Sequence, residues 1–207
     1  MIPQAKRTVP AILLALLLPV TLAGERDPKR SETPKLTVGT KVGQRLPQFK
    51  TELWDVSGET PQKSAFDSHK NAKPTAYVFM SKTCPYCRLY EKRLAKMSKA
   101  YGKQGLRFIM VYPTRKTSAE KKVAYHKQAG FPGPMVNDKD ASIARILGIK
   151  KTPEIVLVAK DGKIVFRGGI DDSPASEDKV TKPHLKTACD DLVAGRKLSV
   201  TGAPLYG

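Results

Sequence analysis

The sequence predicts one α/β domain, a three-layer sandwich in which a mixed β-sheet lies between layers of helices. Short apolar segments rich in β-branched residues alternate along the chain with segments of helical periodicity, and strands that are separated by helices pair in parallel. A late pair of strands joined by a tight turn predicts an antiparallel edge. The 207 residues suffice for one well-buried domain and are too few for two of ordinary size.

The first half of the predicted domain supplies a hairpin, a strand and a helix. Residues 46–58 alternate weakly between apolar and polar side chains and end in a Ser-Gly turn, which is typical of a short hairpin. Residues 74–80 are apolar, aromatic or β-branched and predict a buried strand that runs directly into Cys84. From residue 85 the apolar spacing becomes helical, and a glycine at position 102 ends the predicted helix.

The second half continues the alternation of strands and helices. Thr117 and Glu120 have the spacing of a capping box, and Asp140 is expected to cap a short helix. The predicted elements are a strand over 106–111, a helix over 118–128, a short helix over 140–147, a strand–turn–strand hairpin over 154–166 and a last helix over 178–194.

Residues 1–23 have the pattern of a secretory signal peptide. Lys6 and Arg7 precede an apolar run over residues 11–22, and small residues follow at the spacing that a signal peptidase needs. The run is too short to span a membrane, although an uncleaved N-terminal anchor is the alternative interpretation. The sequence therefore predicts an exported protein, periplasmic or secreted, in an oxidising compartment where disulfides persist.

The rest of the chain divides into three parts. Residues 24–41 are polar and contain two prolines, which predicts a flexible leader. Residues 42–200 form the predicted domain, and residues 201–207 form a C-terminal tail.

The chain is strongly basic, with 37 Lys and Arg against 19 Asp and Glu and a net charge of +18. One interpretation is a solvated surface that keeps the protein soluble. The other is electrostatic association with an anionic surface of the cell envelope or with an acidic partner. Because the basic residues are spread along the chain without a recognisable motif, we expect no nucleic-acid partner.

Two of the three cysteines form the pair Cys84-Pro-Tyr-Cys87. Cys84 is predicted at the end of a buried strand and the start of a helix, where free backbone N–H groups and the helix dipole stabilise a thiolate. Lys82 and Arg88 add positive charge nearby. Cys87 lies one helical turn further in and is expected to be the buried, resolving thiol.

Zinc binding and a purely structural disulfide are the other interpretations of this pair. A zinc site needs four ligands, and the remaining candidates show no spacing of a ligand pair, so we expect no metal. These candidates are Cys189, His69, His126 and His184.

Several other residues have structural interpretations. Cys189 falls on the apolar face of the last predicted helix and is expected in the core. His126 lies in a Lys-rich helix and is expected at the surface, while Asp171 and Asp172 are expected to be solvated in a loop. Trp54 is expected to pack the hairpin onto the core.

The strand that ends in the Cys-Pro-Tyr-Cys sequence and the later Lys151-Thr152-Pro153-Glu154 before another strand resemble the thioredoxin superfamily. The opening VGQRLPQF and DVSGET segments, residues 42–49 and 55–60, are similar to its redoxin branch, the alkyl hydroperoxide reductase and thiol-specific antioxidant type. The resemblance implies a thioredoxin-like fold with an N-terminal hairpin extension. It also implies a cis bond between Thr152 and Pro153, which would shape the substrate-binding surface.

Two positions depart from the thioredoxin pattern. Val78 stands where thioredoxins have a buried Asp that takes a proton from the second thiol. Glu154 follows the proline, and a carboxylate near Cys84 would disfavour its thiolate, unless Glu154 is simply exposed at the start of a strand. The residues expected to tune the pair are Lys82, Pro85, Tyr86, Arg88 and Glu154.

The sequence thus predicts an exported thiol–disulfide oxidoreductase in which Cys84 is the nucleophile and Cys87 the resolving thiol. The resemblance implies protein thiol and disulfide substrates, a redox partner and no cofactor. Two alternatives stay open: a thiol peroxidase, because Ser81 supplies a hydroxyl three residues before Cys84, and a non-catalytic binding module of the cell envelope.

Overall fold

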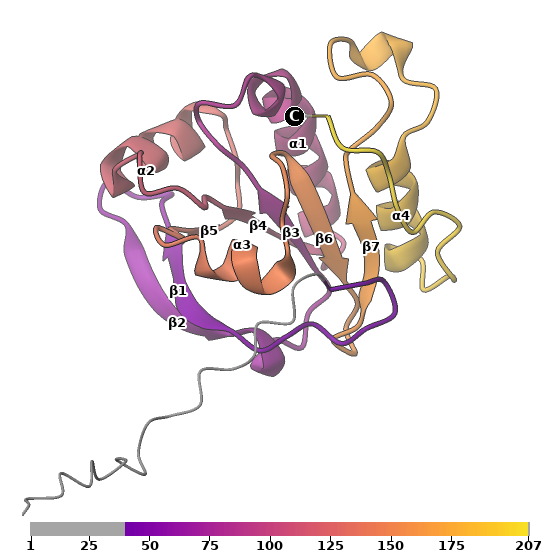
Figure 1. The fold of residues 1–207 in the computed structure, drawn as a ribbon, viewed down its shortest axis with the longest axis horizontal. Helices are drawn as coiled ribbons and strands as arrows, with labels where there is room; N and C mark the ends of the chain where they lie inside the picture. The colour runs from indigo at the N-terminus through magenta and orange to yellow at the C-terminus, as the bar shows by residue number, and fades with distance from the viewer. Residues whose placement is uncertain (1–39, 207) are drawn as a thin grey trace, which may run out of the picture. The chain divides into compact units, whose positions relative to one another are not determined.

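The computed structural model describes residues 40–206, which fold as an α/β sandwich (Figure 1). The predicted signal peptide and nearly all of the predicted leader lie outside the described residues. In chain order the elements are β1 (Lys50–Asp55), β2 (Gln62–Asp67), a 3₁₀ turn (Ser68–Lys70), β3 (Thr75–Phe79), α1 (Pro85–Gly102), β4 (Arg107–Val111), α2 (Ala119–Gln128), β5 (Met135–Val136), α3 (Ser142–Leu147), β6 (Glu154–Val158), β7 (Ile164–Gly168), a second 3₁₀ turn (Glu177–Lys179) and α4 (His184–Val193).

Seven strands form one sheet in the order β2-β1-β5-β4-β3-β6-β7. The central strands β3, β4 and β5 pair in parallel, and the other neighbours pair antiparallel. The predicted mixed sheet and N-terminal hairpin are therefore confirmed. Strand β5 was not predicted, because its two residues are too few to show a period.

Each face of the sheet carries its own apolar cluster. On β6, Ile155 and Leu157 pack in the cluster that contains the buried residues of α1 and α4, and Tyr125 of α2 joins it. Val156 and Val158 point to the other face, where they pack with Leu147 and the rest of α3. Figure 1 shows α1 and α3 on opposite sides of the sheet. The prediction of three layers is confirmed, and α1 covers the face of the sheet to which Ile155 and Leu157 point.

The two short-range caps differ from the prediction by a few residues. Ser118, and not Thr117, caps α2, since its hydroxyl accepts a hydrogen bond from the backbone N–H of Lys121. Asp138, and not Asp140, caps α3 through the N–H groups of the helix's first turn. Between Asp138 and the start of α3 the chain turns at Ala141, whose φ is 53°. This turn brings the carboxylate of Asp138 close to the first N–H groups of the helix.

The last helix is shorter than predicted. Residues 178–194 contain a 3₁₀ turn, a loop and then α4, which begins only at His184. The carboxylate of Asp172 accepts hydrogen bonds from the backbone N–H groups of Thr181 and Lys182, which fixes this loop. Pro183 also disfavours helix at the residue before it.

Two side chains predicted at the surface are buried. His126 is 0% exposed and bonds to the hydroxyl of Tyr112 and the carbonyl of Gly133. Asp171 is 2% exposed and forms an ion pair with Arg93. Both predictions were wrong because buried polar groups are tolerated where hydrogen bonds satisfy them, and the sequence pattern does not reveal those partners. Cys189 is fully buried and Trp54 packs against the same cluster, as predicted.

The residues after α4 return to the sheet. The carbonyls of Thr201 and Ala203 accept hydrogen bonds from the N–H groups of Arg167 and Gly169. A Cβ atom at Gly169 would lie 2.2 Å from the carbonyl oxygen of Pro204, so only glycine admits this approach. Residues 201–205 therefore lie beside the C-terminal end of β7. Within residues 40–206, no helix combines the length and apolar character needed to cross a membrane.

Candidate functional site

The cysteine pair lies at the junction between β3 and α1. Strand β3 ends at Phe79, and Cys84 is the residue immediately before α1, with extended backbone and no side-chain cap on the helix. Cys84 is half-buried, whereas Cys87, inside the first turn, is 0% exposed. Both thiols are free. The strand places the first cysteine at the surface and the helix turns the second into the core, as the sequence predicted.

Two backbone groups contact the sulfurs. The thiol of Cys84 donates a hydrogen bond to the carbonyl oxygen of Thr152 at 2.9 Å. The backbone N–H of Ser81 donates to Sγ of Cys87 at 3.3 Å. The Thr152–Pro153 peptide bond is cis, the isomer that the resemblance implies. Residues 68 positions apart in the chain thus meet at the reactive sulfur.

The second thiol is held in its neutral form. Burial raises the pKa of Cys87 to about 12, against the opposing effect of the N–H of Ser81. Val78 packs in the same cluster and is 0% exposed, so the position that carries an acid in thioredoxins is apolar here. Cys87 must lose a proton before it can attack, and its surroundings do not favour that loss.

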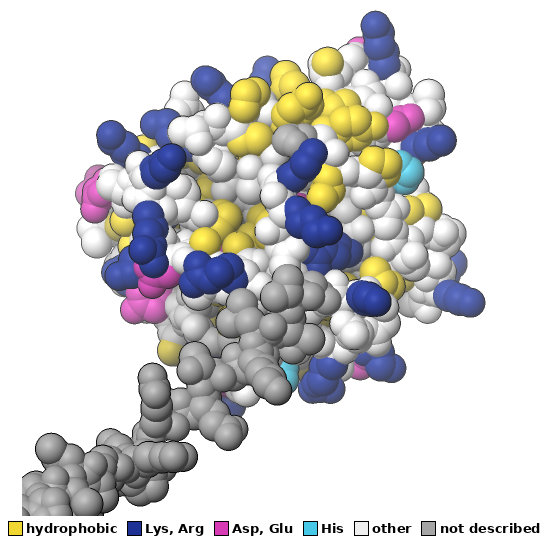
Figure 2. Space-filling model, viewed as in Figure 1, with side chains coloured by type: hydrophobic (Ala, Val, Ile, Leu, Met, Phe, Trp, Pro, Cys, Tyr) yellow, Lys and Arg dark blue, Asp and Glu magenta, His cyan; other side chains and the backbone are white. Residues whose placement is uncertain are grey.

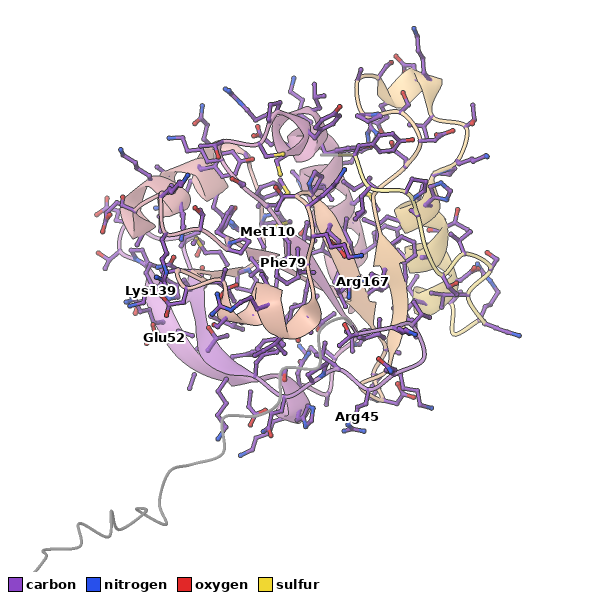
Figure 3. All side chains as sticks on the ribbon, viewed as in Figure 1. Arg45, Glu52, Phe79, Met110, Lys139 and Arg167 are labelled. Atoms are coloured by element: carbon purple, nitrogen blue, oxygen red, sulfur yellow. The ribbon has the colours of Figure 1, made fainter. Side chains whose placement is uncertain are left out.

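Glu154 is directed away from the cysteines. It shares the face of β6 that packs against α3, whereas Cys84 packs against the cluster on the other face. Its carboxylate accepts hydrogen bonds from Nε of Arg167 at 2.8 Å and from the backbone N–H of Lys150 at 3.0 Å. Figure 3 shows Arg167 on β7, beside β6. Glu154 is only 2% exposed, so of the two interpretations left open by the sequence, a carboxylate close to Cys84 and an exposed residue at the start of a strand, neither is correct.

The other residues expected to tune the pair are exposed around Cys84. They are Lys82, Pro85, Tyr86 and Arg88. The hydroxyl of Ser81 lies 3.1 Å from the hydroxyl of Thr83. Within residues 40–206, no three His, Cys, Asp or Glu side chains converge closely enough to hold a metal ion.

Two contacts of the site were not foreseen from the sequence. The sequence draws attention to the hydroxyl of Ser81, yet its backbone N–H is the group that bonds to Cys87, and a backbone contact has no signature in residue type. Arg167 pairs with Glu154 across the β6–β7 hairpin, and no motif of the sequence points to this residue. The period of two along β6 and β7 could have placed these two side chains on one face.

Known proteins resemble this chain over most of its length. A model of the AhpC/TSA family matches residues 42–167. The thiol:disulfide interchange protein DsbE of Escherichia coli K12 is 27% identical over 175 residues, which cover 84% of this chain and 86% of that protein.

Solved structures give the same picture of the fold. A hypothetical protein of Sinorhizobium meliloti 1021 aligns with a TM-score of 0.68 and 26% identity, covering 82% of this chain and 93% of that one. A thioredoxin-like protein in the oxidised form aligns with a TM-score of 0.58 and 16% identity, covering 76% and 99%. The predicted thioredoxin-like fold is confirmed.

Proposed function

We propose that this chain, which belongs to the AhpC/TSA family and is a thiol–disulfide oxidoreductase, exchanges disulfides with protein substrates through Cys84 and Cys87. The observation that carries the proposal is the asymmetry of the pair. One thiol is half-buried at the start of a helix and bonds to the carbonyl of Thr152, and the other is fully buried three residues later. Such a pair can open a disulfide at the surface and close its own inside the fold.

The reaction has two steps in the reducing direction. The thiolate of Cys84 attacks one sulfur of the substrate disulfide, whose S–S bond breaks. The departing substrate sulfur keeps the electron pair and takes a proton. Cys87 then loses its proton and attacks Sγ of Cys84, which breaks the mixed disulfide and releases the second substrate thiol. Two electrons have moved from the dithiol of the protein to the substrate, and the reverse sequence oxidises a substrate dithiol.

The remaining roles follow from position. The polypeptide of the substrate would lie against Thr152 and Pro153, where the chain offers the carbonyl that the thiol of Cys84 occupies in the reduced state. Lys82, Pro85, Tyr86 and Arg88 would tune the reactivity of Cys84 from around it. No cofactor takes part, and a second thiol–disulfide protein would reset the pair. Export rests on the signal-peptide pattern of residues 1–23.

Insulin reduction by dithiothreitol tests the proposal. We expect Cys84→Ala to be inactive, because the nucleophile is lost, and Cys87→Ala to accumulate mixed disulfides that are visible on non-reducing gels. Cys189→Ala is the matched control, since Cys189 is buried in α4 and has no part in the exchange. Reduction by Cys84→Ala at the wild-type rate would overturn the proposal.

Hydrogen peroxide separates this function from a peroxidase. A disulfide oxidoreductase should react with peptide disulfides much faster than with peroxide, since Cys87 is placed to resolve a mixed disulfide. Rapid formation of a sulfenic acid at Cys84, followed by mass spectrometry, would instead favour the peroxidase alternative.

A further inference from the structure

We propose that the surface around Cys84 selects protein segments in which the reacting cysteine is accompanied by an apolar side chain and flanked by carboxylates. The inference rests on the proposed function, because it concerns the substrates of the same pair. It names a class of substrate by the chemistry that this surface complements.

The first observation is apolar. The large hydrophobic side chains that are well exposed among residues 40–206 are Val42, Tyr86 and Leu89, and two of the three belong to the first turns of α1. Tyr86 and Leu89 are 39% and 48% exposed. They are three residues apart, so they share one face of the helix. Figure 2 shows hydrophobic side chains gathered over the part of the surface where α1 lies in Figure 1.

The second observation is charge. Lys82, Arg88 and Lys151 are exposed, and none of them forms an ion pair with a carboxylate of residues 40–206. The two segments that meet at Cys84, residues 80–90 and 149–153, contain no Asp or Glu. Among the exposed lysines elsewhere in residues 40–206, Lys63, Lys96, Lys163 and Lys186 pair with carboxylates of that range, whereas others, such as Lys99 and Lys103, do not. The two segments that contain Cys84 and its carbonyl partner therefore carry positive charge that no carboxylate within them and no ion pair of residues 40–206 compensates.

The two observations define one kind of partner. An exposed apolar surface this close to a nucleophile favours a substrate that buries an apolar side chain there, and unpaired cations favour carboxylates at the rim. Cys84 directly precedes the helix turns that carry Tyr86 and Leu89, and its thiol bonds to the carbonyl of Thr152, the residue after Lys151. The recognised segment must therefore contain the reacting cysteine. Charges at a rim act chiefly on the rate of encounter and weaken with salt.

Three symmetric peptide disulfides test the inference. They share a Cys-Leu centre and differ only in flanking Glu, Gln or Lys. With reduced protein we expect the Glu peptide to react fastest and the Lys peptide slowest. The two rates should differ by about tenfold at about 0.01 M salt, where the Debye length is about 30 Å. The three rates should converge at about 0.15 M salt, where the Debye length is about 8 Å. The rate with uncharged 2-hydroxyethyl disulfide is the reference for each protein.

Matched variants separate the local surface from the net charge. Lys82→Gln with Arg88→Gln should abolish the preference for Glu, measured as the ratio of the Glu rate to the Gln rate. Lys99→Gln with Lys103→Gln removes the same charge from exposed positions at the other end of α1 and should keep the ratio. Equal rates for the three peptides, or a ratio retained after the change at Lys82 and Arg88, would overturn the inference.

A fourth peptide, with Ser in place of Leu, tests the apolar part. With the wild-type protein this peptide should react more slowly than the Leu peptide. The difference in rate should disappear in Leu89→Ser and persist in Val42→Ser, which removes an apolar side chain of comparable exposure outside α1. Persistence in both variants would contradict the apolar part of the inference. Failure of the wild-type protein to react with 2-hydroxyethyl disulfide would overturn the proposed function itself.

Discussion

The proton on Cys87 controls the second step of the exchange. Its pKa is raised to about 12 by burial, so the fraction of thiolate grows about tenfold per pH unit throughout the neutral range. We therefore expect resolution of the mixed disulfide to accelerate by nearly that factor per unit between about pH 7 and 9. Acid quenching of single turnovers, with the mixed disulfide counted by mass spectrometry, measures this rate.

Cys87→Ala isolates the first step and serves as its control, because that variant cannot resolve the mixed disulfide. If the resolution rate of the wild-type protein did not change with pH, another group would have to take the proton from Cys87. The mechanism drawn from the apolar surroundings at Val78 would then be wrong.

His126 links the stability of the fold to pH in the acid range. Burial lowers its pKa from 6.5 to about 4, and its ring bonds to the hydroxyl of Tyr112 and the carbonyl of Gly133 as a neutral imidazole. Between these pKa values the unfolded chain binds a proton that the folded chain does not. The contribution of His126 to the free energy of unfolding is therefore complete above about pH 6.5 and falls as the pH falls toward about 4. About 2 kcal/mol of that free energy is lost by pH 5.

Urea unfolding of the wild-type protein and His126→Gln at about pH 7.5 and pH 5 measures this linkage. Glutamine can keep one of the two hydrogen bonds but does not titrate. The loss of stability between the two pH values should be smaller in the variant by about 2 kcal/mol. Identical losses in both proteins would show that His126 is not the titrating group.

At the scale of elements, a buried ion pair joins α1 to the loop after β7. Arg93 pairs with Asp171, which also accepts a hydrogen bond from the hydroxyl of Tyr90 at 3.0 Å. Asp171→Asn would leave the guanidinium buried without a counter-charge, and we expect a loss of about 3–5 kcal/mol of unfolding free energy. Asp178→Asn, an exposed carboxylate in the same loop, should change it by less than about 0.5 kcal/mol. Equal effects in urea unfolding would contradict the structural role of the pair.

The elements also show what the sequence could and could not predict. Strands β3, β4 and β6 were predicted because nearly all of their residues are apolar and buried, and β7 because it follows β6 after a tight turn. Helix α1 was predicted because its buried apolar residues recur at helical spacing. The start of α4 was missed because the carboxylate of Asp172 accepts hydrogen bonds from the backbone N–H groups of Thr181 and Lys182, nine and ten residues later, and these bonds fix the loop before the helix. The cysteine pair was placed correctly since a strand and a helix adjoin in the sequence. The orientation of Glu154 depended on Arg167, thirteen residues away across a hairpin.

Across the whole molecule, the strands of the sheet differ in how many residues pair with their neighbours. Strands β3 and β6 pair along their full length, from Thr75 with Val158 to Phe79 with Glu154. The hairpin of β1 and β2 is attached through a single pair, Trp54 with Met135 of the short strand β5. Apolar contacts add to this attachment, because the ring of Phe49 packs edge-on against that of Tyr77 at 5.6 Å. Cys84 and Cys87 follow β3, one of the strands that pair along their full length.

This unevenness predicts that the hairpin opens before the rest of the fold. Native-state hydrogen exchange should give the amides of β1 and β2 a lower free energy of opening than those of β3, which exchange only on global unfolding. The β6–β7 hairpin is the internal control: β6 is bound along its length to β3, so its amides should match those of β3. Phe49→Leu should speed exchange in β1 and β2 more than in β3, because it loosens the contact with Tyr77. Equal opening free energies for β1 and β3 would mean that the extension folds as one cooperative unit with the core.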